Sequence, residues 1–205
     1  MANKNYEYHA LGSYKYELFQ LIMKHELSEF LIDILMPSIE DNRFDKIDNF
    51  IGGLFEYHGS DGIERVNLKS HLFDVPFIYS TVTDTRNVIC IDTNISRCGN
   101  TLKEMSVVIE IMAHKNSLQL DSETRMKYKK LGYIGRNRID IAVAILGDIL
   151  NGSKDFGIGK LVPAPSVPTQ SYFPNNDFWG KILRYSCTDF MKDVKNTRDF
   201  SHVMN

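Results

Sequence analysis

The sequence predicts an α+β fold: an antiparallel β-sheet with a central hairpin, flanked by two main helices and joined by extended arms and loops. Three observations predict it. Helical spacing of apolar residues runs over 14–36 and again over 139–150, and two adjacent β-rich runs cover 86–95 and 104–114. Because helices do not separate the strands one by one, we do not expect a parallel doubly wound sheet.

Composition agrees with a globular chain of 205 residues, since 43% are hydrophobic and 24% are charged, which excludes wholesale disorder. We expect one domain, with an N-terminal helical addition over about 1–70, an α+β core over about 70–190 and a flexible tail over 191–205. Lysines and arginines number 24 and acidic residues 26, so the net charge of −2 predicts no general affinity for nucleic acid or anionic membranes.

The cellular setting is predicted from cysteines and hydropathy. Three scattered cysteines, an odd number, favour a reducing compartment and use as buried small hydrophobes. No stretch approaches 18 uninterrupted apolar residues, and the first residues lack the apolar region of a signal peptide. We therefore expect a soluble protein that is made in the cytoplasm and does not contact a membrane.

The first helical pattern, over 14–36, carries apolar residues three and four apart, with charged residues between them. Pro37 is expected to end it, because the residue before a proline avoids the helical region. Ser28 is expected to cap a second, short helix after a break. Beyond it we predict a polar loop over 38–49, a short strand over 53–59 and an irregular arm over 60–79.

The hairpin is the clearest β signal. Its first strand covers 86–95 and its second 104–114, with a turn-rich connector at 96–100, so the two strands should pair antiparallel. The second strand alternates between an apolar face and a mixed face. The apolar face holds Met105, Val107, Ile109, Ile111 and Ala113; the mixed face holds Ser106, Val108, Glu110, Met112 and His114.

A charged loop is expected over 121–138, followed by the second main helix. In that helix Asn137 and Asp140 form a weakened capping box, and Asn151-Gly152 provides the left-handed stop.

The rest of the chain reads as strand and turn. Pro163, Pro165 and Pro168 predict an edge strand or an extended segment, because proline cannot donate to a central ladder. A turn is expected at 174–177 and a final strand over 181–188.

No catalytic, cofactor or metal motif is recognised in the sequence, and we expect a protein that is not an enzyme. The histidines form no HxH or HExxH pattern, and Gly157-Ile158-Gly159-Lys160 lacks the strand before and helix after that a phosphate loop needs. One alternative is a small metal-dependent nuclease or hydrolase with Asp84, Asp92 and Glu110 around a divalent ion.

Two surface features are candidates for contact with another protein or with DNA. The segment 121–138 carries six cations against two acids, which is typical of a solvated loop but also of a surface that contacts phosphates or an acidic protein. Its cations are Arg125, Lys127, Lys129, Lys130, Arg136 and Arg138. A DNA-binding module using residues 125–138 is a second alternative. The aromatic residues Phe173, Phe178 and Trp179 beside a Pro-Asn-Asn turn are candidate interface anchors.

Four stretches carry a resemblance to a known family. Residues 72–78 and 86–92 (LFDVPFI and RNVICID), followed by the hairpin, resemble head–tail junction proteins of tailed bacteriophages. So do GRNRID at 135–140 and LNGSKDFGIGKL at 150–161. The resemblance covers roughly residues 70–190 and is to the neck and tail-terminator proteins. Members are often shorter, so the first 70 residues would be an addition.

The resemblance implies a structural virion protein without an active site. Such proteins form rings, typically six- or twelvefold, that cap the tail tube and join it to the portal or connector. Their partners are copies of themselves, portal or connector proteins, and tail tube or sheath proteins, and genomic DNA passes the lumen without specific binding. Ring subunits need two different complementary surfaces, which projecting loops or open strand edges could provide.

Overall fold

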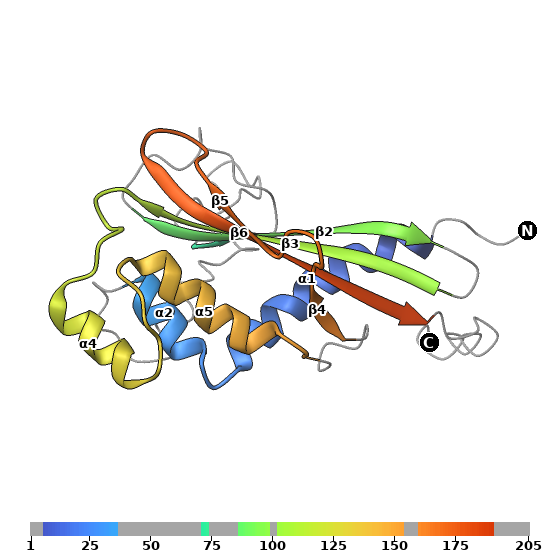
Figure 1. Cartoon of the computed structure of the whole chain (residues 1–205). Coiled ribbons are helices and arrows are strands. Elements are labelled where there is room, and N and C mark those ends of the chain that lie inside the picture. The colour runs from blue at the N-terminus through green and yellow to red at the C-terminus, as the bar shows by residue number, and fades with distance from the viewer. Residues whose placement is uncertain (1–5, 37–70, 74–85, 99–101, 154–159, 191–205) are drawn as a thin grey trace, which may run out of the picture.

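The computed structural model describes residues 6–36, 71–73, 86–98, 102–153 and 160–190. These ranges contain four helices and six strands, which confirms the α+β class (Figure 1). The helices are α1 (Tyr6–Lys24), α2 (Ser28–Leu35), α4 (Ser122–Lys130) and α5 (Arg138–Leu150). The strands are β1 (Leu72–Phe73), β2 (Asn87–Cys98), β3 (Leu102–His114), β4 (Leu161–Pro163), β5 (Thr169–Tyr172) and β6 (Phe178–Phe190).

The six strands form one sheet in the order β1-β2-β3-β6-β4, with β5 pairing β6 further along the same edge. The predicted hairpin is confirmed: β2 and β3 pair antiparallel, with Ile91 opposite Ile109. The expectation of a wholly antiparallel sheet is wrong at one edge, where β1 pairs parallel with β2. Strand β2 also extends to Cys98, through residues that the turn-rich composition assigned to the connector.

The helices lie on one face of the sheet, and the main hydrophobic core lies between the helices and the sheet (Figure 1). The predicted apolar face of β3 supplies five buried side chains to this core, and β6 adds Leu183, Tyr185 and Cys187. Helices α1, α2 and α5 contribute to the same core, so the N-terminal helices share it with the sheet. Burial of each large aliphatic side chain contributes about 1.5–3 kcal/mol.

A break between α1 and α2 occurs near the predicted position, but Ser28 is not the cap. Leu27 occupies the N-cap with helical dihedral angles and no side-chain hydrogen bond, and Ser28 Oγ is buried without a hydrogen-bond partner. Helix α2 ends at Leu35, one residue before Met36 and two before the proline.

Helix α5 forms as predicted. Asn137 Oδ1 accepts a hydrogen bond from the amide of Asp140 at 2.8 Å, and Asn137 Nδ2 donates to the Asp140 carboxylate at 2.7 Å. Gly152 adopts φ +77°, the left-handed conformation that glycine tolerates.

The expected loop over 121–138 is wrong for residues 122–130, which form α4. This helix has no apolar stripe, because Tyr128 is its one buried residue. It is held at its start by Asp121, whose Oδ1 accepts from the Thr124 amide at 2.7 Å. It is held against α2 by Tyr128, whose hydroxyl donates to the Phe30 carbonyl at 2.8 Å.

The segment after α5 lies at the sheet edge, as the prolines predict. Strands β4 and β5 both pair with β6, and β5 is a strand that the sequence did not indicate. The expected turn at 174–177 is confirmed, with Asn175 Oδ1 accepting from the amides of Asp177 and Phe178. The expected strand at 53–59, most of the arm over 60–79 and the tail lie outside the described residues.

Candidate interaction surfaces

The predicted basic segment divides into residues used inside the fold and residues left on the surface. Arg138 is buried, which corrects its assignment to an exposed basic surface. Its guanidinium donates to the carbonyl oxygens of Ser117 and Ile34. Lys127 is exposed but is paired with Asp33 at 3.2 Å. The cations that remain for other contacts are Arg125, Lys129, Lys130 and Arg136.

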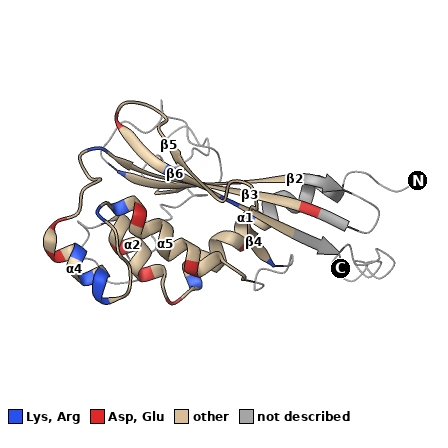
Figure 2. Cartoon of the chain, viewed as in Figure 1, with Lys and Arg blue, Asp and Glu red and all other residues tan. Residues whose placement is uncertain are grey.

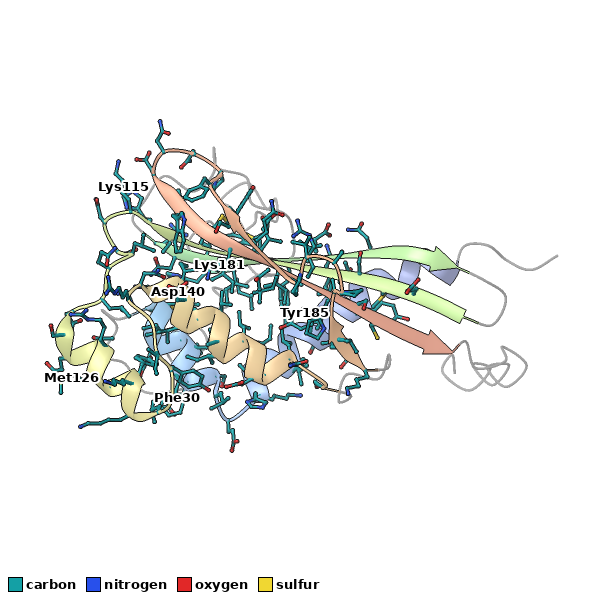
Figure 3. The ribbon with its side chains drawn as sticks, viewed as in Figure 1. Phe30, Lys115, Met126, Asp140, Lys181 and Tyr185 are labelled. Carbon is teal, nitrogen blue, oxygen red and sulfur yellow. The ribbon has the colours of Figure 1, made fainter. Side chains whose placement is uncertain are left out.

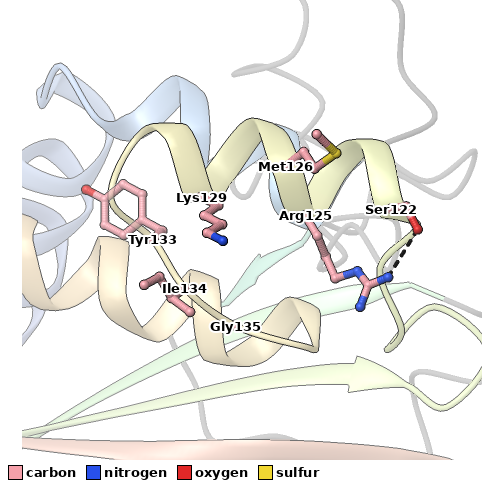
Figure 4. Close-up of a pocket in the computed structure, with 7 residues that line it drawn as sticks. All are labelled: Ser122, Arg125, Met126, Lys129, Tyr133, Ile134 and Gly135. Carbon is pink, nitrogen blue, oxygen red and sulfur yellow. Dashed lines mark hydrogen bonds between the residues drawn. The ribbon is translucent and has the colours of Figure 1, made fainter.

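A groove lies between α4 and the loop that leads to α5 (Figure 4). We call it the α4 groove; its volume is about 370 Å³. Its lining residues are Ser122, Arg125, Met126, Lys129, Tyr133, Ile134 and Gly135. Met126 is 62% exposed and Ile134 82% exposed, so the groove combines cations with unusually accessible apolar side chains.

The two cations that line the groove form no ion pair with another described residue. Arg125 Nη2 donates to Ser122 Oγ at 3.1 Å, a neutral partner. Tyr133 donates to the Asp148 carboxylate at 2.9 Å, and burial together with this hydrogen bond raises the pKa of the Tyr133 phenol to about 12.

Figure 2 shows how the charges are distributed. Lysines and arginines gather on α4, while α5 carries both signs of charge. One of its acids, Asp140, pairs with Lys181 of β6 at 2.7 Å, and Figure 3 shows the two side chains together between helix and sheet. Met126, in contrast, points away from the body of the protein in the same view.

The second candidate surface is the border of the sheet along β4 and β5, which we call the β5 edge. Its exposed apolar side chains are spread along this border: Val162 lies opposite Ser186, Phe173 lies against Trp179, and Val167 lies between the two strands. All three side chains are exposed, Phe173 by 65%. The Phe173 ring lies 6.1 Å from the ring of Trp179, centroid to centroid, in a tilted arrangement. Trp179 is half-buried and packs against the main core, so the Phe173 ring lies against a side chain that is already held in place.

Phe178 does not belong to this surface, although the sequence grouped it there. It is buried in a second cluster with Val88, Cys90 and Met112, and its ring meets His114 edge-on at 5.4 Å. Since β-strand side chains alternate between faces, Phe178 and Trp179 necessarily lie on opposite sides of the sheet.

The comparison with protein families gives a match over residues 17–187, to the family described as YomW. The chain belongs to the YomW family. The family name suggests a phage-derived protein. No curated protein and no solved structure matches the chain.

The YomW match begins within α1 and ends within β6, so it includes both the α4 groove and the β5 edge.

The match also includes the three carboxylates of the nuclease alternative. Asp84 lies outside the described residues, and Asp92 is ion-paired with Lys15 at 3.0 Å. Glu110 stands opposite Cys90 in the β2–β3 register. Among the described residues of this YomW-family chain, no three His, Cys, Asp or Glu side chains are grouped as metal ligands would be.

One observation of the structure concerns membrane contact. Within the part of the chain that is described, no helix has the length and apolar character needed to cross a bilayer.

Proposed function

We propose that this chain is a structural subunit of a phage neck. Copies would form a ring, six- or twelvefold, that caps the tail tube and joins it to the portal or connector, with a channel left for DNA. Assembly would take place in the host cytoplasm, and the finished ring would belong to the virion. Membership of a phage-derived family supports a phage setting. The neck is proposed only from the sequence resemblance over residues 70–190.

The β5 edge carries the proposal of self-assembly. Phe173 is 65% exposed and packs against the half-buried Trp179, an arrangement typical of an aromatic interface anchor, and Val162 and Val167 are further exposed apolar side chains on the same border. Ring closure joins two different surfaces of neighbouring copies, so the β5 edge would meet another face of the next subunit.

The contact at the β5 edge is expected to use side chains rather than added strands. Pro163, Pro165 and Pro168 interrupt this border, and prolines remove the amide donors that strand addition would need. Ala164 and Pro168 already bond to Arg184 of β6 through their backbones, so both turn their hydrogen-bonding groups inward.

The proposed channel role fits the overall charge. A net charge of −2 gives the ring no strong electrostatic grip on duplex DNA, which favours passage over binding. No catalytic step is proposed for any side chain of this protein.

Native mass spectrometry and electron microscopy of the full chain test the proposal. We expect a closed ring for the wild type, and loss of the ring for Phe173→Asp with an unchanged circular dichroism spectrum. Gln170→Asp is the matched control, because Gln170 is exposed on β5, three residues before Phe173, and is already polar. A wild-type chain that stays monomeric at micromolar concentration would refute self-assembly.

A further inference from the structure

We infer that the α4 groove binds an acidic protein segment that also carries an apolar side chain. The identity of that partner as a neighbouring virion protein rests on the proposed function. The docking chemistry does not, and it can be tested on the isolated chain. The sequence left open whether the basic segment faces DNA or protein. Three features of the groove favour protein, and a fourth separates the partner from a second copy of this chain.

The first feature is the combination of charge and apolar surface. Arg125 and Lys129 line the groove together with Met126 and Ile134, which are exposed by 62% and 82%. A phosphate backbone offers nothing apolar to cover these two side chains. Protein interfaces, in contrast, are enriched in methionine and arginine, and methionine adapts its shape to a partner.

The second feature is that only some of the six basic residues of the segment are available to a ligand. Of the six basic residues in the segment, Arg138 is buried and Lys127 is paired with Asp33. Two cations therefore line the groove, with Lys130 and Arg136 as exposed neighbours in the chain. Several aligned phosphate contacts are needed for strong nucleic-acid binding, and this arrangement provides few.

The third feature is the acidic residues at the margin of the groove. Asp121 and Glu123 lie at the start of α4, next to the lining residue Ser122, and Asp148 is bonded to the lining residue Tyr133. A continuous polyanion along the groove would approach these carboxylates and be repelled. A short acidic segment can place its charges on the cations alone.

The fourth feature separates this partner from a second copy docked through the β5 edge. Residues 161–173 contain no aspartate or glutamate. The β5 edge therefore lacks the charge that would complement Arg125 and Lys129, so the groove is not the face that the β5 edge would meet on a neighbouring copy.

Helix α4 presents the groove in a preformed state. The Asp121 cap fixes its first turn, and the Tyr128 hydroxyl anchors its last turn to the Phe30 carbonyl. Binding a partner would therefore order few additional groups, which reduces the entropy cost of association.

Fluorescence anisotropy with the full chain tests the inference. The probe is a fluorescein-labelled peptide of glutamate and leucine; a peptide of glutamate alone and a labelled DNA duplex are measured in parallel. We expect saturable binding of the Glu/Leu peptide, tighter than that of either other probe. Lys129→Glu should weaken it about tenfold through charge, and Ile134→Ser should weaken it separately through lost apolar contact.

Lys24→Glu is the matched control, because it makes the same charge change at an exposed position of α1 outside the groove. Binding that is equally weakened by Lys24→Glu, or unaffected by Lys129→Glu and Ile134→Ser, overturns the inference. Tighter binding of duplex DNA that depends on Lys129 would identify a nucleic-acid site instead. Ring loss in Ile134→Ser without peptide binding by the wild type would identify a contact between copies.

The two proposals fail separately. Ring assembly is measured through Phe173, and peptide binding through Lys129 and Ile134, so a chain that never forms rings can still confirm the groove.

Discussion

The guanidinium of Arg138, at the first residue of α5, donates a hydrogen bond to the carbonyl oxygen of Ile34 near the end of α2. The last carbonyls of a helix lack partners within it and carry partial negative charge, so a cation is favourable there. Arg138 Nε also donates to the Ser117 carbonyl at 2.8 Å. One side chain thus joins α5, α2 and the segment that follows β3.

A second polar residue completes this junction. Asn87 Nδ2 donates to the Leu35 carbonyl at 2.7 Å, and Ser117 Oγ donates to Asn87 Oδ1 at 2.6 Å. The end of α2 is therefore capped by side chains from β2 and α5, which are distant in sequence. Buried polar groups are tolerated in the core here because each has a partner.

Arg138→Ala should lower the free energy of unfolding by about 3 kcal/mol, because it removes the donor from the buried carbonyl of Ile34 and from the part-buried carbonyl of Ser117. Urea unfolding followed by circular dichroism measures the change. Arg136→Ala is the control, since Arg136 is exposed two residues earlier, and it should change stability by less than about 0.5 kcal/mol. Equal midpoints for the two variants would show that the junction is not stabilising.

Substitution of glycine by alanine is expected to have opposite effects on stability at two positions. A Cβ at Gly180 would lie 2.0 Å from the carbonyl oxygen of Ile111 on the paired strand, so Gly180→Ala must push β3 and β6 apart. A Cβ at Gly147, within α5, would meet nothing within 4 Å. We expect Gly180→Ala to destabilise by at least about 3 kcal/mol and Gly147→Ala to stabilise by about 0.5–1 kcal/mol.

Thermal unfolding of both alanine variants measures the contrast. A Gly180→Ala protein with unchanged unfolding temperature would mean that the strand pair has more room than its geometry indicates.

Local patterns were sufficient to predict the elements whose own residues decide their structure. Strand β3 alternates in side-chain character, and α5 carries both a cap at Asn137 and a stop at Gly152. The buried thiols were also predicted, since the side chains of Cys90 and Cys187 are buried. Each of these features depends on residues close together in the chain.

The features that were missed depend on distant partners. Helix α4 has no apolar stripe, and its anchor is a hydrogen bond from Tyr128 to Phe30, 98 residues away. Arg138 looks like a surface cation until Ile34, 104 residues earlier, is placed beside it. Phe178 and Trp179 are adjacent, and only strand register shows which of them faces the helices. For the groove, the sequence indicated the cations but not Met126 and Ile134.

The buried thiols should be unreactive in the folded protein. In a Cys98→Ser variant, which retains Cys90 and Cys187, we expect no reaction with Ellman's reagent until denaturant is added. Burial, and to a lesser extent the Glu110 carboxylate, raises the pKa of the Cys90 thiol well above its ordinary value of 9.0. The thiolate that reacts is therefore absent from the folded state at pH 8.

The same raised pKa makes stability depend on pH. The folded thiol stays protonated while the unfolded thiol ionises, so this contribution is fully present below about pH 9 and is lost as the pH rises toward the folded pKa. Urea midpoints of Cys98→Ser should fall between pH 8 and pH 10 more steeply than those of Cys98→Ser with Cys90→Ala. Parallel slopes would contradict the burial of an ionisable thiol.

Helix α4 should depend on its cap more than the other helices do, because Tyr128 alone anchors it by burial and helices of this length are marginal. Asp121→Ala removes the acceptor for the Thr124 amide and hydroxyl. We expect faster amide hydrogen exchange throughout α4, with little change in global unfolding. Asp121→Asn keeps an acceptor at the cap and should exchange nearly as slowly as the wild type.

Acid should reproduce the effect of the alanine variant. Hydrogen bonds from Thr124 lower the pKa of the Asp121 carboxyl below its ordinary 3.8, so the charged cap is fully effective above that pH and is lost as the pH falls through the lowered value. Because Arg125 and Lys129 are held in position by α4, Asp121→Ala should also weaken binding of the Glu/Leu peptide at neutral pH. Fast exchange in α4 with undiminished peptide binding would show that the groove forms only when the partner arrives.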